Sequence, residues 1–140
     1  MIILDTNVLY ELMKTGVDPN VANWLRQQQR SMLFTTTVSE AEIAAGIAIL
    51  PEGRRRRDFE FNATMVFNAF ENRVVPFDRA AAKRYARIIG ERRQAGRPIS
   101  TFDAQIAAIA LSQGMMLATR NVKDFIDLDL PIINPWELQK

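Results

Sequence analysis

A chain of 140 residues with 48% hydrophobic content is long enough for one domain with a substantial core and too short for two ordinary domains, so we expect a single domain over residues 1–140. The sequence contains no Cys and no His, which excludes disulfides, thiol and Ser-His-Asp catalysis and the usual zinc sites, and leaves oxygen ligands for a hard ion such as Mg²⁺ or Mn²⁺. The net charge of +2 is unevenly distributed along the chain: residues 53–97 carry 12 Lys/Arg and 5 Asp/Glu (+7), and the remaining residues carry 6 Lys/Arg and 11 Asp/Glu (−5). This distribution suggests a surface that binds a polyanion beside a site that binds cations.

The predicted elements alternate between short apolar strands and helices. In chain order they are a strand at 1–4, a helix at 8–13, a helix from Pro19, a strand at 32–37, helices at 38–50 and 54–71, a strand at 73–77, helices at 78–94 and 100–114, a strand at 115–119 and a possible edge strand at 131–136. This alternation predicts a parallel sheet covered on both faces. We therefore expect an α/β fold, a three-layer α/β/α sandwich with a short, mostly parallel five-stranded sheet.

Acidic side chains follow or neighbour these strands. Asp5 comes directly after the first strand, Glu42 is expected in the first turn of the helix after the second, and Asp103 opens the Ala-rich helix before the fourth. Asn121 and Asp124 follow that fourth strand. Parallel strands bring the residues beyond their carboxyl ends to one edge of the sheet. Acids gathered there repel one another unless a cation lies among them, so the pattern predicts a divalent metal site.

Each acid also has a purely structural explanation. The segments Ser39–Glu42 and Ser100–Asp103 have the spacing of a capping box, and Asp5 can cap the helix that follows it. Taken one at a time, the acids are explained by helix capping. Their shared position near strand ends is what favours a common site.

The ordered segments MIILDTNVL, VSEAEIAAGIAIL, ISTFDAQIAAIA, MMLATRNVKDF and INPW resemble the PIN-domain nucleases, in particular the VapC/FitB-type toxins of bacterial toxin–antitoxin pairs. Together they span nearly the whole chain. The resemblance implies a PIN-like fold and an endoribonuclease that cleaves RNA phosphodiesters with a water activated by Mg²⁺ or Mn²⁺. It also implies a homodimer, inhibition by a cognate antitoxin protein, and assembly of toxin and antitoxin on DNA through the antitoxin.

The resemblance places the acidic cluster of the family on Asp5, Glu42 and Asp103, and its fourth acid on Asn121. We expect Asp5 and Asp103 to be the principal metal ligands, Glu42 to hold a metal-bound water or act as the base, and Asn121 to orient water or substrate. Asparagine at this position puts a second metal in doubt, although Asp124 can supply charge nearby. Supporting positions around the ligands are predicted at Thr6, Asn7, Thr119 and Asp124.

The basic middle of the chain is the predicted RNA-binding region. The residues expected to line a groove for the phosphate backbone are Arg84, Arg87, Arg92, Arg93 and Arg97. The run from Arg54 to Arg57 is expected at its rim or on a surface that faces the antitoxin. Apolar stripes such as that of Phe59 and Phe67 fit either the core or a partner-binding groove.

Two other functions compete with a ribonuclease. The first is a nuclease-like module that has lost its metal and acts through protein partners. The only residue that favours this alternative is Asn121, which stands at the position of the fourth acid. An aspartate-nucleophile phosphatase is suggested by the segment from Asp5 to Val8, but Asn7 occupies the place of its second aspartate. The chain shows no signal-peptide pattern and no apolar run long enough for a membrane span, so we expect a cytoplasmic protein without membrane contact.

Overall fold

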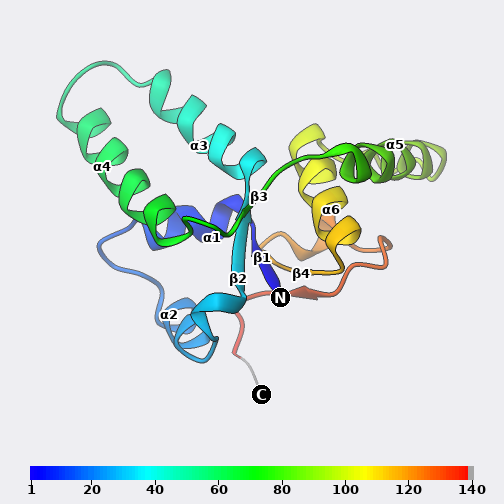
Figure 1. Ribbon diagram of the computed structural model, residues 1–140, viewed down its shortest axis with the longest axis horizontal. Coiled ribbons are helices and arrows are strands. Elements are labelled where there is room, and N and C mark those ends of the chain that lie inside the picture. Colours follow the sequence, from blue (N-terminus) through cyan, green and yellow to red (C-terminus); the bar gives the residue numbers. More distant parts are fainter. Residues whose placement is uncertain (139–140) are drawn as a thin grey trace.

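The structure is a computed structural model that describes residues 1–138. Five strands form one sheet in the order β3-β2-β1-β4-β5, and all four pairings are parallel (Figure 1). The strands are β1 (Ile2–Leu4), β2 (Leu33–Thr36), β3 (Val74–Val75), β4 (Met116–Ala118) and β5 (Ile132–Ile133). In register, Ile2 pairs with Leu33 on one side of β1 and with Met116 on the other. The predicted edge strand is therefore confirmed as β5.

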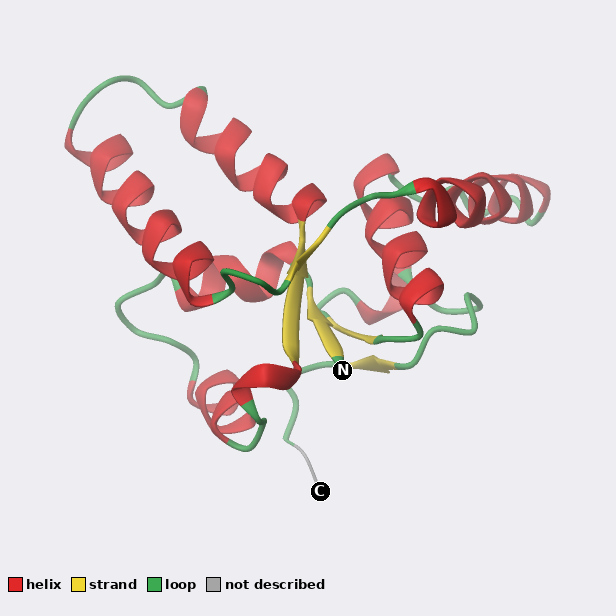
Figure 2. Ribbon diagram, in the orientation of Figure 1, coloured by secondary structure: helices red, strands yellow, loops and turns green. Residues whose placement is uncertain are grey.

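Helices cover both faces of the sheet, as the apolar strands predicted (Figure 2). They are α1 (Thr6–Leu12), α2 (Pro19–Arg26), α3 (Thr37–Ala48), α4 (Arg54–Ala69), α5 (Arg79–Gln94) and α6 (Thr101–Gln113), with 3-10 turns at Arg30–Met32 and Val122–Asp124. Within the described part of the chain, no helix has the length and apolar character that a bilayer crossing requires.

Side chains of β1 alternate between two cores, because successive residues of a strand point to opposite faces. Ile3 packs into a cluster with α5, α6 and Leu117. Ile2 and Leu4 pack into a second cluster with residues of α1, α2, α3 and α4. These two cores on either side of the sheet establish the three-layer sandwich that the sequence predicted.

The start of α3 differs from the prediction. Its N-cap is Thr36, whose side chain accepts a hydrogen bond from the N–H of Ser39. Ser39 is therefore inside the helix and fully buried, and the predicted capping box from Ser39 to Glu42 is wrong. Glu42 lies in the second turn of α3 rather than the first. The other two predicted caps are present, since Asp5 accepts from the N–H of Thr6 and Ser100 accepts from the N–H of Asp103.

Candidate active site

Asp5 and Thr119 follow the neighbouring ends of β1 and β4, and we call the region beyond these two strand ends the crevice. These neighbouring strands lie in the middle of the sheet, and the chain continues from β1 to one side and from β4 to the other. The N–H of Asp5 donates to the carbonyl of Ala118 (2.9 Å), which extends the β1–β4 pairing by one residue. Ligands of open α/β sheets bind at such a reversal of strand order, beyond the carboxyl ends of the strands.

Asp5 is held at this crevice by hydrogen bonds to both of its carboxylate oxygens. Its Oδ1 accepts from the N–H of Thr6 (2.8 Å), and its Oδ2 accepts from Thr119 Oγ1 (2.7 Å) and Asn7 Nδ2 (3.4 Å). Only 4% of Asp5 is exposed. The pKa of Asp5 is raised from 3.8 to about 6: burial is the main cause, the hydrogen bonds from Thr119 and Thr6 oppose it, and the charges of Asp103 and Glu42 add to it.

Glu42 reaches the crevice from the second turn of α3. Thr6 Oγ1 lies 2.9 Å from Glu42 Oε1 and 2.9 Å from Ser39 Oγ. A hydroxyl has one proton, so when Thr6 donates to Glu42 the Ser39 hydroxyl donates to Thr6. Burial raises the pKa of Glu42, the bond from Thr6 lowers it, and the charge of Asp103 raises it further.

Asp103 enters from the first turn of α6, opposite α3. Burial raises the pKa of Asp103, the hydrogen bond with Ser100 opposes this, and the charge of Asp124 raises the pKa further. Asp103 and Asp124 both line a pocket of about 430 Å³, together with Arg97 and Lys123. Asp103 therefore faces an open, mixed-charge pocket, whose lining does not include Asp5 or Glu42.

The acids lie close enough for each of Asp5, Glu42 and Asp103 to have its pKa raised by a neighbouring carboxylate. The charges of Glu42 and Asp103 act on Asp5, that of Asp103 on Glu42, and that of Asp124 on Asp103. Among residues 1–138, none of these four acids forms an ion pair with Lys or Arg. In the same residues, no group of three or more acidic side chains is placed so that it could hold a metal ion. The site is a row of neighbouring, unneutralised carboxylates rather than a closed coordination shell.

Thr119 links the predicted supporting residues to one another. It is fully buried, and its Oγ1 donates to Asp5 Oδ2 while accepting from Asn7 Nδ2 (3.2 Å) and from the N–H of Asn121 (3.1 Å). Asn121 is thereby placed beside the acids by its backbone, at the start of the turn Val122–Asp124. The structure thus brings Thr6, Asn7, Thr119 and Asn121 to the same crevice as the acids.

The predicted arginine groove is only partly formed. Arg92 is 7% exposed, and its guanidinium donates to the carbonyls of Asp124 (3.0 Å) and Ile126 (2.7 Å). It also lines the mixed-charge pocket with Asp103, so its contact with RNA stays a prediction. Arg97 pairs with Asp127 at the mixed-charge pocket, and Arg87 pairs with Glu91 (3.1 Å) on the surface of α5. Arg84 and Arg93 are exposed on the same helix.

Sequence reasoning missed three residues around the site. Ser39 completes the hydroxyl pair beside Glu42, and helical spacing from Thr36 would have indicated that it is buried. The pKa of Tyr10 is raised by burial and by the charge of Glu42, which places this α1 residue near the acids. Arg120 donates its backbone N–H to Asn7 Oδ1 (3.4 Å), and no local sequence pattern predicts this contact.

Comparison with known proteins identifies the family. The model of the PIN domain family matches residues 2–130. The plasmid stability protein StbB of Pseudomonas syringae pv. tomato is 40% identical over 138 residues, which cover 98% of this chain and 99% of that protein. The VapC ribonuclease Y4jK of Sinorhizobium fredii is 39% identical over 138 residues, with the same coverage. The solved structure of FitAB bound to a DNA fragment superimposes with a TM-score of 0.90 at 31% identity, covering 100% of this chain and 99% of that one.

These matches span nearly the whole chain and agree with the parallel sheet and with the order of its elements. The chain belongs to the PIN domain family, and its homologues include VapC and FitB toxins.

Proposed function

We propose that the chain is a single PIN domain that acts as a divalent-metal-dependent endoribonuclease and as the toxin of a toxin–antitoxin pair. One observation carries this proposal: Asp5, Glu42 and Asp103, from three different elements, lie close together, Thr6 hydrogen-bonds both Asp5 and Glu42, and none of the three acids forms an ion pair among the described residues. Like charges are kept together in this way where the function needs a metal. The similarity to a VapC ribonuclease supports RNA as the substrate.

The residues present fit Mg²⁺ or Mn²⁺. The donors are carboxylate, hydroxyl and amide oxygens, and the chain has no His or Cys that would favour softer metals. Mg²⁺ keeps several of its waters and binds proteins through one or two carboxylates, so it does not need three acidic side chains in direct contact with it. Asp5 and Asp103 would hold the ion, with Glu42 reaching it directly or through water.

When bound, the ion neutralises charge on the phosphate and lowers the pKa of a water molecule. Glu42 has a raised pKa and is fixed by Thr6, so it is suited to accept the proton that the attacking water gives up. The water oxygen forms the new P–O bond while the ester P–O bond to the leaving oxygen breaks, and the leaving oxygen takes up a proton from solvent. Asn7 and Thr119 keep Asp5 in a single orientation, and Asn121 would orient water or substrate.

Asp103→Asn is the direct test. It keeps the size of the side chain but removes one ligand charge, so we expect RNA cleavage with Mg²⁺ or Mn²⁺ to fall on the order of hundredfold or more. Asp78→Asn is the matched control, since Asp78 also stands at the N-terminus of a helix but is exposed on α5. Cleavage by Asp103→Asn at the wild-type rate would rule out the proposed site.

An antitoxin protein and a homodimer are proposed as the partners, with assembly on DNA through the antitoxin. The structure of FitAB bound to DNA supports this, since its FitB-like chain superimposes along the whole length of this one. A groove of about 520 Å³ between α3 and α4 has an apolar floor that includes Ile43, Ile47, Ala63 and Phe67. Co-expression with the small neighbouring gene should relieve growth arrest, and Asp5→Ala should abolish the arrest without it.

The aspartate-nucleophile alternative finds little support in the geometry. Asn7 stands where that chemistry has its second aspartate; its amide donates to Asp5 Oδ2 and Thr119 Oγ1, and it has no carboxyl group to transfer a proton.

A further inference from the structure

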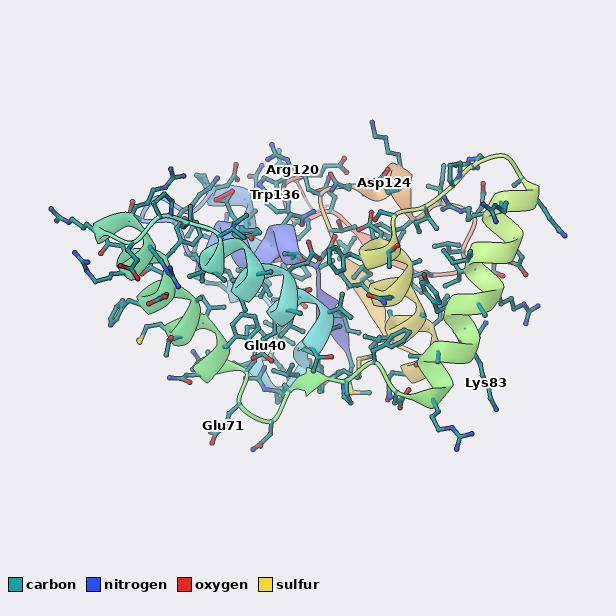
Figure 3. All side chains as sticks on the ribbon, turned by 90° about the horizontal axis from the view of Figure 1, so that it is seen from above. Glu40, Glu71, Lys83, Arg120, Asp124 and Trp136 are labelled. Carbon is teal, nitrogen blue, oxygen red and sulfur yellow. The ribbon has the colours of Figure 1, made fainter. Side chains whose placement is uncertain are left out.

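Arg120 stands at the rim of the acidic crevice. It lies between Thr119, which holds Asp5, and Asn121, and its backbone N–H donates to Asn7 Oδ1. Its side chain is exposed and lies over the ring of Trp136, with the guanidinium carbon 5.1 Å from the ring centroid. Figure 3 shows the two side chains next to each other, on the same side of the molecule as Asp124.

Trp136 is a firm support for this arginine. Its backbone N–H donates to Asn134 Oδ1 (3.0 Å), and its carbonyl accepts from Asn20 Nδ2 (2.9 Å) at the start of α2. Its ring Nε1–H donates to Glu11 Oε1 (3.2 Å) on α1. Glu11 is itself buried and paired with Lys14, so the indole of Trp136 is bound to α1 and its backbone to α2.

Arg120 differs from the buried or structural arginines of this protein in that its guanidinium N–H groups have no hydrogen-bond acceptor among the described residues. Arg92 donates to the carbonyls of Asp124 and Ile126, and Arg73 donates to three backbone carbonyls. Within residues 1–138, the guanidinium of Arg120 makes no hydrogen bond and no ion pair. A guanidinium stacked on an aromatic ring loses little freedom on binding, and its planar N–H groups match two phosphate oxygens at once.

We propose that Arg120, supported by Trp136, binds a backbone phosphate of the RNA next to the bond that is cleaved. This inference rests on the proposed function, which supplies the RNA. The exposed guanidinium supplies positive charge on the rim of a crevice whose own side chains are acidic, and it anchors the strand without reading its sequence. Arg120 is thus a positioning residue, and Trp136 acts through it.

The experiment measures binding separately from cleavage. Fluorescence anisotropy of a labelled single-stranded RNA, in chelator and at several salt concentrations, gives affinity and salt dependence for the wild type and for Arg120→Ala. We expect Arg120→Ala to weaken binding roughly fivefold to tenfold, and to reduce the slope of log affinity against log salt by about 0.7. Arg120→Lys should recover part of the loss, since it keeps the charge without the planar fork.

Arg26→Ala is the matched control, because it removes one exposed arginine from the end of α2, near the start of β2 and away from the crevice. If Arg120→Ala and Arg26→Ala bind RNA with the same affinity and salt slope, the inference is wrong. Loss of binding by Arg120→Ala supports it even where the wild type cleaves no RNA with Mg²⁺ or Mn²⁺, a result that would refute only the proposed function.

A double-mutant cycle tests the part played by Trp136. Trp136→Leu should weaken RNA binding in the wild-type background and have little further effect in Arg120→Ala. Strictly additive effects would show that Trp136 does not act through Arg120. Thermal unfolding checks that each variant folds, and the Arg120 variants decide the main inference even where Trp136→Leu is unstable.

Discussion

Replacing Asp5 by asparagine should inactivate the protein and make its metal-free form more stable. The difference between the ordinary pKa of 3.8 and the value of about 6 in the fold corresponds to about 3 kcal/mol by which ionised Asp5 opposes folding. Asparagine avoids this charge and remains a good N-cap toward Thr6. Its Nδ2 would stand where Asp5 Oδ2 accepts from Thr119 Oγ1 and Asn7 Nδ2, and the loss of these two bonds offsets most of the gain, so we expect a net gain of about 1 kcal/mol in the free energy of unfolding at pH 8.

The pH dependence follows from the sign of the shift. Because the pKa of Asp5 is higher in the folded state than in the unfolded state, its favourable contribution is fully present below about pH 4. That contribution is lost as the pH rises through about 6. The advantage of Asp5→Asn over the wild type should therefore be largest at about pH 8, shrink between about pH 6 and pH 4, and vanish below that.

Urea denaturation followed by circular dichroism, in chelator at several pH values, measures this difference. Asp78→Asn is again the control, since Asp78 caps α5 by accepting from the N–H of Ala81 but is exposed, and we expect almost no change in stability. An Asp5→Asn variant that is no more stable than the wild type at pH 8, or whose advantage is equal at pH 4 and pH 8, would refute the argument from burial and repulsion.

Three further predictions concern the metal, Glu42 and Arg92. Mg²⁺ at roughly 100 times its dissociation constant should raise the free energy of unfolding of the wild type by about 2.7 kcal/mol and that of Asp5→Asn far less, as followed by thermal shift; equal shifts would argue against Asp5 as a ligand. Glu42→Gln keeps an acceptor for Thr6 but removes the base, so cleavage should fall roughly hundredfold or more in a single-turnover assay; an unchanged rate would remove Glu42 from the mechanism. Arg92→Leu takes two donors from the carbonyls of Asp124 and Ile126 and should lower stability to urea by about 2–4 kcal/mol. Arg93→Leu is the control, because Arg93 is the exposed neighbour, and we expect its free energy of unfolding to change by no more than about 0.5 kcal/mol. Equal losses of stability in the two variants would mean that the buried contacts of Arg92 contribute nothing.

The sequence predicted the sheet and most helices because their signals are local. An apolar run such as Ile2–Leu4, followed by a helix with apolar spacing, has few other interpretations. The error at α3 arose because the Ser39–Glu42 spacing offers a second possible helix start. The structure uses Thr36 instead, since β2 ends there and its hydroxyl is free to cap.

The arginines show where prediction from sequence stops. Charge alone does not reveal whether a guanidinium faces solvent or satisfies carbonyls, and Arg92 meets carbonyls that a loop about 30 positions away presents. Arg120 and Trp136 lie in irregular segments without periodicity, so nothing in the sequence indicates that they stack. The acids were easier to place, because parallel strands bring their carboxyl ends to one edge whatever the intervening chain does.

The segment after residue 130 forms hydrogen bonds that hold β4, and with it one side of the crevice, in place. The N–H groups of Leu117 and Thr119 donate to the carbonyls of Pro131 (2.9 Å) and Ile133 (3.0 Å), and Trp136 is fastened to Glu11. A protease that clipped the tail at residue 130 would strip both partners from β4 and loosen Thr119, the residue that orients Asp5. Removal of this segment would thus impair the site although all of its acidic residues remain.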